Sequence, residues 1–86
     1  MTRAITFDTN GWEDYVYWQR QDRKTLKRIN QLIADVVRDP FAGIGKPEPL
    51  KHILSGAWSR RIDDKNRVVY YVTDPHVIIL QARDHF

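Results

Sequence analysis

The sequence predicts a single α+β domain, residues 1–86, in which two N-terminal helices pack on one face of an antiparallel or mixed β-sheet. The 86-residue chain has the length of one small domain. Its first half contains two stretches with apolar residues at helical spacing, and its second half contains β-branched and aromatic runs separated by turn-forming residues. No internal repeat or composition change interrupts this order.

The composition favours a soluble protein with an acidic partner. Fourteen Lys and Arg against eleven Asp and Glu give a net charge of +3, a modest excess that favours nucleic acid over a neutral partner. Cysteine is absent, which excludes disulfides and thiolate metal sites. Since no apolar run approaches the ~20 residues of a membrane span and no signal-peptide core follows the first residues, we expect a cytoplasmic protein without a membrane anchor.

The N-terminal segment predicts a short strand and a first helix. Arg3–Phe7 has the alternation of a strand. The helix is expected from about Gly11 to Arg20, with Asn10 at its N-cap and Glu13 completing a capping box. Trp12 and its helical neighbours form an aromatic face, which we interpret as core packing.

A second helix is expected from about Arg23 to Arg38, because Asp22 can cap its start and the following Asp-Pro pair ends the helical pattern. One side of this helix is apolar at regular spacing. Lys24, Lys27 and Arg28 cluster on the opposite side. Such a basic face is usually only solvated, but it could also contact an RNA backbone.

The segment Asp39–Pro49 contains three prolines and two glycines, and it therefore predicts a loop without a regular element. Glu48 lies between two of these prolines, so its backbone has little freedom. A carboxylate held in this way suits a general base, although the local sequence is also compatible with a solvated loop glutamate. Leu50–Leu54 is expected to form a strand, and Ser55-Gly56 the turn after it.

A basic β-hairpin is the central feature of the sequence, with Ala57–Ile62 and Arg67–Thr73 flanking a polar break. We expect Arg60, Arg61 and Arg67 to present guanidinium groups on one face, where their forked donors match phosphate oxygens. A two-residue loop would separate Arg61 from Arg67. A three-residue loop pairs them and keeps the apolar residues together on the other face, and we therefore prefer it.

A final strand is expected over His76–Phe86, and its continuously apolar first half predicts an interior position in the sheet. Gln81, Arg83 and His85 would alternate onto one face, where the imidazole could serve as a general acid. The three histidines of the chain match no common metal-ligand spacing, so we expect neither a metal nor a cofactor.

These motifs resemble those of a known family. The shared residues lie in Trp12, Asp14-Tyr15, Trp18-Gln19, Asp39–Phe41 and Gly43, and they are densest in Gly45–His52, Leu54–Gly56, Trp58–Ile62, Arg67–Tyr70 and His85. On this basis the chain resembles the YoeB toxins of the RelE superfamily, which are ribosome-dependent mRNA interferases of bacterial toxin–antitoxin pairs. The family pattern ends in His-Tyr, whereas this chain ends in His85-Phe86.

The resemblance implies a RelE-like, microbial-ribonuclease-like fold and metal-free cleavage of mRNA in the ribosomal A site, by attack of a ribose 2′-hydroxyl on the adjacent phosphate. It implies that Glu48 is the general base, that His85 is the general acid, and that Arg67 neutralises the charge of the transition state. The remaining substrate-binding candidates are Lys51, Arg61 and Arg83 for phosphate and Phe86 as a stacking platform for a base.

The resemblance also implies a homodimer and a YefM-like antitoxin whose disordered segment folds over the toxin. The other implied partners are the 70S ribosome, mRNA and, only through the antitoxin complex, operator DNA. Lys24, Lys27, Arg28 and Lys46 are the candidate contacts to ribosomal RNA. Two alternatives stay open: a basic module that binds RNA or the ribosome without cleavage, and a co-repressor subunit that acts on DNA with its antitoxin.

Overall fold

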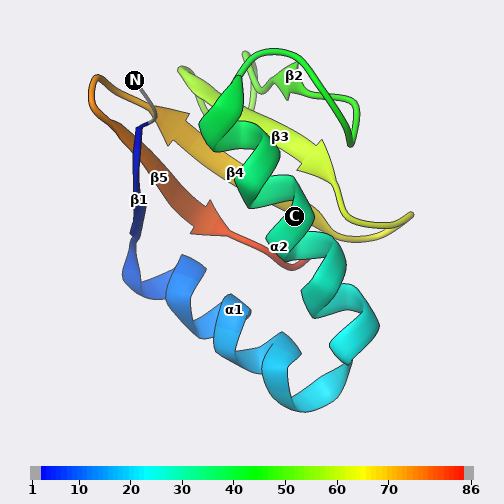
Figure 1. The fold of residues 1–86 in the computed structure, drawn as a ribbon. Helices are drawn as coiled ribbons and strands as arrows, with labels where there is room; N and C mark the ends of the chain where they lie inside the picture. The colour runs from blue at the N-terminus through cyan, green and yellow to red at the C-terminus, as the bar shows by residue number, and fades with distance from the viewer. Residues whose placement is uncertain (1–2, 85–86) are drawn as a thin grey trace.

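The computed structural model describes residues 3–84, which form a five-stranded sheet with two helices on one face (Figure 1). In chain order the elements are β1 (Ala4–Phe7), α1 (Thr9–Gln21), α2 (Arg23–Arg38), β2 (Glu48–Pro49), β3 (Ala57–Arg61), β4 (Arg67–Val72) and β5 (His76–Gln81). The strand order is β1-β5-β4-β3-β2, with β1 parallel to β5 and the other pairs antiparallel. The predicted α+β class with a mixed sheet is confirmed. Neither helix within residues 3–84 is long and apolar enough to cross a membrane.

Helix α1 begins earlier than the sequence predicted. Asp8 is its N-cap and accepts a hydrogen bond from the Gly11 N–H at 2.7 Å, so the predicted Asn10–Glu13 capping box is wrong. Gly11 lies against the sheet, where a Cβ atom would come within 2.2 Å of the Ile79 carbonyl oxygen. Only glycine permits this close approach, which fixes the start of the helix on β5.

Helix α2 has the predicted bounds, and Asp22 caps it by accepting from the backbone N–H groups of Lys24 and Thr25. Its inner side is fully buried and packs against the central strands. The core consists of Ile29, Leu32, Ile33 and Val36 from the helix and Ile62, Val68, Tyr70, Val77, Ile79 and Ala82 from the sheet region. Burial of each large side chain contributes about 1.5–3 kcal/mol, so this layer fixes the position of the sheet beneath it.

The hairpin has the predicted three-residue loop, because Arg61 pairs with Arg67 and Trp58 with Tyr70. The prediction that Arg60 shares a face with them is wrong. Consecutive strand residues point to opposite faces, so Arg60 lies on the helix-covered side and is fully buried.

Arg60 fastens the loop after α2 to the sheet. Its guanidinium donates to Asp35 Oδ2 at 2.5 Å and to the Tyr70 hydroxyl at 3.2 Å. It also donates to three loop carbonyl oxygens, those of Asp39, Ala42 and Ile44. Burial alone would raise the pKa of Asp35, but hydrogen bonds from the Ile44 N–H, Arg60 and Arg38 outweigh it and lower that pKa to about 2.

Two strand predictions in the second half are wrong. Glu48–Pro49 forms the two-residue strand β2 inside the predicted loop, whereas Leu50–Leu54 forms a turn closed by the Leu54 N–H and the Leu50 carbonyl oxygen at 2.9 Å. Leu50 is buried because it packs on Ala57, not because it belongs to a strand. Strand β5 ends at Gln81, because both backbone polar groups of the next residue, Ala82, bond to side chains of α1 and not to β4.

Candidate active site

The helix-free face of the sheet brings Glu48 and Arg67 together. Glu48 lies opposite Ser59 in the β2–β3 pair, and Arg61 lies opposite Arg67 in the β3–β4 pair. Because residues directly opposite one another share a face, all four side chains are on the side that the helices do not cover. The Arg67 guanidinium donates to the Glu48 carboxylate and, at 3.2 Å, to the Ser59 hydroxyl.

The Glu48–Arg67 pair is partly exposed to solvent, and the buried Ser59 lies beneath it. The side chain of Glu48 is 54% exposed and that of Arg67 is 33% exposed, whereas Ser59 is fully buried. Ser59 was not identified from the sequence, although strand alternation puts it on the face of Arg61, two residues later. Such a pair combines two roles at one place: the exposed carboxylate can accept a proton, and the fixed guanidinium can bind an anion.

Arg61 also borders a hollow near the hairpin loop. Its guanidinium forms an ion pair with Asp64 at 2.9 Å, and its carbonyl oxygen accepts from Arg28 at 3.4 Å. The hollow has a volume of about 300 Å³, and Arg28, Lys46 and Arg61 all line it. Three candidates from distant parts of the sequence therefore gather at this end of the sheet.

The other basic candidates lie elsewhere on the surface. Lys24 and Lys27 are exposed on α2, and Lys27 borders a separate depression next to Arg23 and Asn30. Lys51 is exposed in the turn that follows β2. The structure thus leaves these lysines accessible to a large partner and does not gather them with Arg61.

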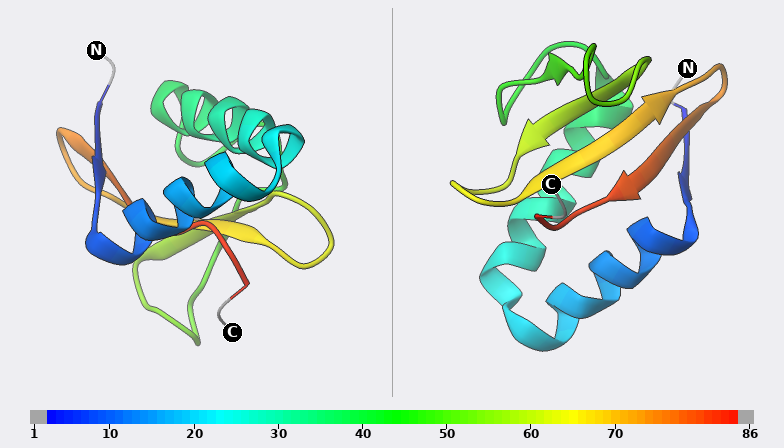
Figure 2. Two further views of the ribbon diagram at one scale, coloured as in Figure 1. Left: turned by 90° about the horizontal axis from the view of Figure 1, so that it is seen from below. Right: turned by 180° about the vertical axis from the view of Figure 1, so that it is seen from behind.

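The C-terminal segment leaves the sheet on its helix-free side (Figure 2, left). The guanidinium of Arg83 lies 3.6 Å from the ring centre of Tyr17 on α1, and the backbone N–H of Asp84 donates to Asn66 Oδ1 at 2.9 Å. Asn66 directly precedes Arg67, so the described chain ends beside the strand that carries the candidate cation. The predicted site residues His85 and Phe86 lie outside the described residues.

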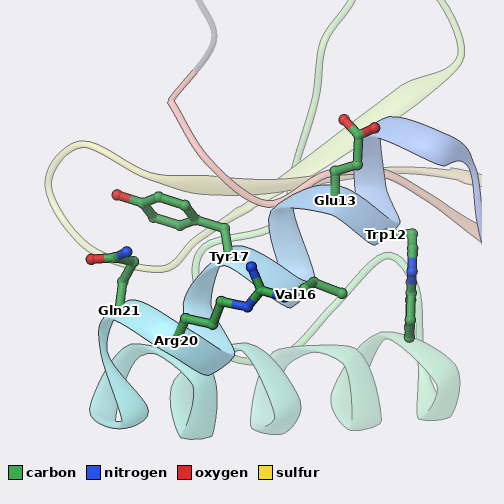
Figure 3. Close-up of a pocket in the computed structure, with 6 residues that line it drawn as sticks. All are labelled: Trp12, Glu13, Val16, Tyr17, Arg20 and Gln21. Atoms are coloured by element: carbon green, nitrogen blue, oxygen red, sulfur yellow. The ribbon is translucent and has the colours of Figure 1, made fainter.

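A third concave region lies on the outer side of α1 (Figure 3). It has a volume of about 330 Å³ and is lined by Trp12, Glu13, Val16, Tyr17, Arg20 and Gln21. Trp12 is 51% exposed and contacts the rings of Phe7 and Tyr15, so the prediction that it belongs to the core is wrong. Neither Glu48 nor Arg67 lines this region. Within residues 3–84, no group of three or more His, Asp or Glu side chains could hold a metal ion.

Comparisons with known proteins agree on one family. A family described as "YoeB-like toxin of bacterial type II toxin-antitoxin system" matches residues 7–86. The chain is 65% identical to Toxin YoeB of Streptomyces coelicolor over 82 residues, which cover 95% of this chain and 98% of that protein. It is 51% identical to Toxin YoeB of Escherichia coli over 82 residues, with 95% and 98% covered.

Solved structures of YoeB proteins are similar to this chain in fold as well as in sequence. The YoeB dimer from Staphylococcus aureus superposes with a TM-score of 0.90 and 42% identity over 100% of both chains. The heterotetrameric YoeB–YefM toxin–antitoxin complex from the same organism superposes with a TM-score of 0.88 and 42% identity, again over 100% of both chains.

Proposed function

The chain belongs to the family of YoeB-like toxins of bacterial type II toxin–antitoxin systems, and from this premise we propose that it is a metal-independent endoribonuclease. Its substrate would be mRNA in the ribosomal A site, and cleavage would inhibit translation in the cytoplasm. The observation that supports this proposal most is the contact between Glu48 and Arg67 on the helix-free face. A base and a fixed cation side by side are what phosphoryl transfer without a metal requires.

The proposed reaction is an internal transfer within the RNA. Glu48 takes the proton of a ribose 2′-hydroxyl, and the 2′ oxygen forms a bond to the adjacent phosphorus. The bond between phosphorus and the 5′ oxygen of the next nucleotide breaks, and His85 gives that oxygen a proton. The products are a cyclic phosphate and a free 5′-hydroxyl, so protons and bonds balance without an added reactant.

Arg67 has a specific part in this reaction. Its guanidinium is paired with the Glu48 carboxylate and bonded to Ser59, which fixes its direction. When an RNA phosphate enters, Arg67 can donate to the phosphate oxygens as their negative charge grows, and Glu48 is then released to act as the base. Arg61, opposite Arg67 in the hairpin, and Lys51 would add to the positive potential.

The proposed partners follow from the relatives. The YoeB structures from Staphylococcus aureus are a dimer and complexes with YefM, which supports a homodimer and a YefM-like antitoxin for this chain. We further propose that the ribosome holds the message in position, since a net charge of +3 is little for binding a flexible single strand. The proposed contacts to ribosomal RNA are Lys24, Lys27, Arg28 and Lys46.

The test is cleavage of a defined message on purified ribosomes, with the same message free in solution as the second arm. We expect cuts that map inside the A-site codon, a cyclic phosphate at the new 3′ end, and little cutting of the free message. Glu48→Gln serves as the inactive control. Ribosome binding without cuts would instead favour the non-catalytic module, and DNA binding that requires the antitoxin, without any cleavage, would favour the co-repressor.

A further inference from the structure

Ala82, the residue that follows β5, is hydrogen-bonded to side chains of α1 through both its backbone N–H and its backbone carbonyl oxygen. The indole N–H of Trp18 donates to the Ala82 carbonyl oxygen at 2.7 Å, and the Asp14 carboxylate accepts from the Ala82 N–H at 2.9 Å. Asp14 is 4% exposed and Ala82 is 1% exposed, so the bond between them is shielded from water. Asp14 and Trp18 are four residues apart on one helix, and this spacing puts both side chains on the same face.

The next two residues are held as well. Arg83 lies over the ring of Tyr17, and the N–H of Asp84 donates to Asn66. Each residue from Ala82 to Asp84 therefore has a partner outside the strand ladder. Chain ends usually fray unless they are tied down, and here contacts from α1 and the hairpin loop hold this end beside Arg67.

The contacts to Ala82 exceed what filling the core would require. A buried carboxylate is unfavourable unless hydrogen bonds compensate for its lost hydration, and an apolar residue at position 14 would fill the same space without that penalty. The ring of Trp18 could likewise be replaced by a phenylalanine if only packing mattered. The indole N–H of Trp18 and the Oδ2 atom of Asp14 are instead directed at the backbone of Ala82.

We propose that Asp14 and Trp18 are positioning residues for the cleavage reaction. They fix Ala82, and His85 follows three residues later, within a span of at most roughly 10–11 Å of extended chain. By restricting this end of the chain, they keep the imidazole within reach of the Glu48–Arg67 pair and reduce the entropy lost on entering the transition state. The inference rests on the proposed function, and specifically on His85 as the general acid.

The test is a double-mutant cycle between Trp18→Phe and His85→Ala, measured as single-turnover cleavage of a ribosome-bound message. Trp18→Phe removes the indole donor and keeps an aromatic ring. We expect this variant to lower the cleavage rate at saturating ribosomes about 10-fold, which is no more than the loss of a general acid would cost. The ribosome concentration that gives half of the maximal rate should change by less than about twofold. The double variant should be no slower than His85→Ala alone, because the imidazole that Trp18 positions is then absent.

Trp12→Phe is the matched control, since it is the same substitution on the same helix at a residue whose ring packs on Phe7 and Tyr15. It should cleave at the parental rate. Asp14→Ala should reproduce the loss of Trp18→Phe, whereas Asp14→Asn should lose less because its amide oxygen can still accept from Ala82. Hydrogen exchange gives a readout without activity: the Ala82 and Asp84 amides should be protected in the parent and exchange faster in Trp18→Phe.

Three results would overturn the inference while the proposed function stands. They are parental cleavage by Trp18→Phe, an equal fold-loss from Trp18→Phe with and without His85, and unprotected Ala82 and Asp84 amides in the parent. Parental cleavage by His85→Ala would also overturn it, since no acid would remain to be positioned. A parent protein that cuts no message on ribosomes would instead overturn the proposed function, and the inference with it.

Discussion

Removal of the buried Arg60 should destabilise the protein far more than removal of the exposed Arg38, although both arginines bind the same carboxylate. Arg60 is fully buried and donates to Asp35, Tyr70 and three loop carbonyl oxygens. Arg38 donates to Asp35 at 2.9 Å from a side chain that is 64% exposed. The substitutions Arg60→Met and Arg38→Met thus compare the stability lost with a buried and with an exposed arginine that bind the same carboxylate.

The expected magnitudes follow from these surroundings. Loss of one partner of a buried ion pair costs about 3–5 kcal/mol, and we expect about 3 because the Asp35 side chain is 16% exposed and keeps two other donors. Loss of an exposed ion pair costs about 0–1 kcal/mol. At roughly 4–8 °C per kcal/mol for a domain of this length, Arg60→Met should lower the melting temperature by about 12–24 °C. Total stability for such a domain is only about 4–13 kcal/mol, so this is a large share.

The assay is equilibrium urea unfolding of the parent and both variants, followed by circular dichroism at fixed salt. Asp35→Asn should be measured alone and combined with Arg60→Met, because the coupling free energy isolates the pair. The slope of the unfolding free energy against urea concentration should be the same in the parent and the variants if their unfolded states are alike. An Arg60→Met variant within 1 kcal/mol of Arg38→Met would refute the argument that burial makes Arg60 the anchor of the loop.

Further predictions concern the site and the acid limb of stability. Glu48→Ala and Arg67→Ala should each lower the rate of cleavage on ribosomes about 10²-fold, and the free energy of unfolding should change by less than about 1 kcal/mol. A variant that cleaves at the parental rate would show that the role assigned to its residue is wrong. Because the pKa of Asp35 is lowered from 3.8 to about 2, its contribution to stability should be complete above about pH 4 and disappear towards pH 2. Urea unfolding at stepped pH should show this decline in the parent and not in Asp35→Asn. Cleavage should persist in excess EDTA once ribosome integrity is controlled, and rescue by zinc alone would contradict it. Phe86→Tyr should change single-turnover cleavage by less than tenfold, since a stacking platform needs no hydroxyl.

The structure could be predicted from the sequence wherever interactions between residues close in the chain determine it. Helix α2 was predicted with its bounds because Asp22 is the one capping residue at its start and an Asp-Pro pair follows its end. The hairpin register was predicted because only the three-residue loop keeps the apolar residues on one face, and Arg61 does pair with Arg67. Strand alternation alone could also have excluded Arg60 from that face.

Other features depend on contacts between distant residues. Asp8 and Asn10 are both good capping residues, and the approach of Gly11 to β5 determines which of them caps the helix. The short apolar run Leu50–Leu54 fits a strand or a turn, and the pairing of Glu48 with Ser59 leaves it as the turn. For the same reason the contact of Glu48 with Arg67 was not predictable from local sequence.

The pairing of β1 with β5 has a consequence for biosynthesis. These are the first and last strands within residues 3–84, so the sheet cannot close until β5 has been synthesised. Contacts between such distant segments also slow folding, because a long loop must be ordered before they form. A nascent chain that lacks β5 offers no partner to β1 and no Ala82 backbone to α1. Under the proposed function, the nuclease thus stays incomplete until the ribosome that makes it has translated β5.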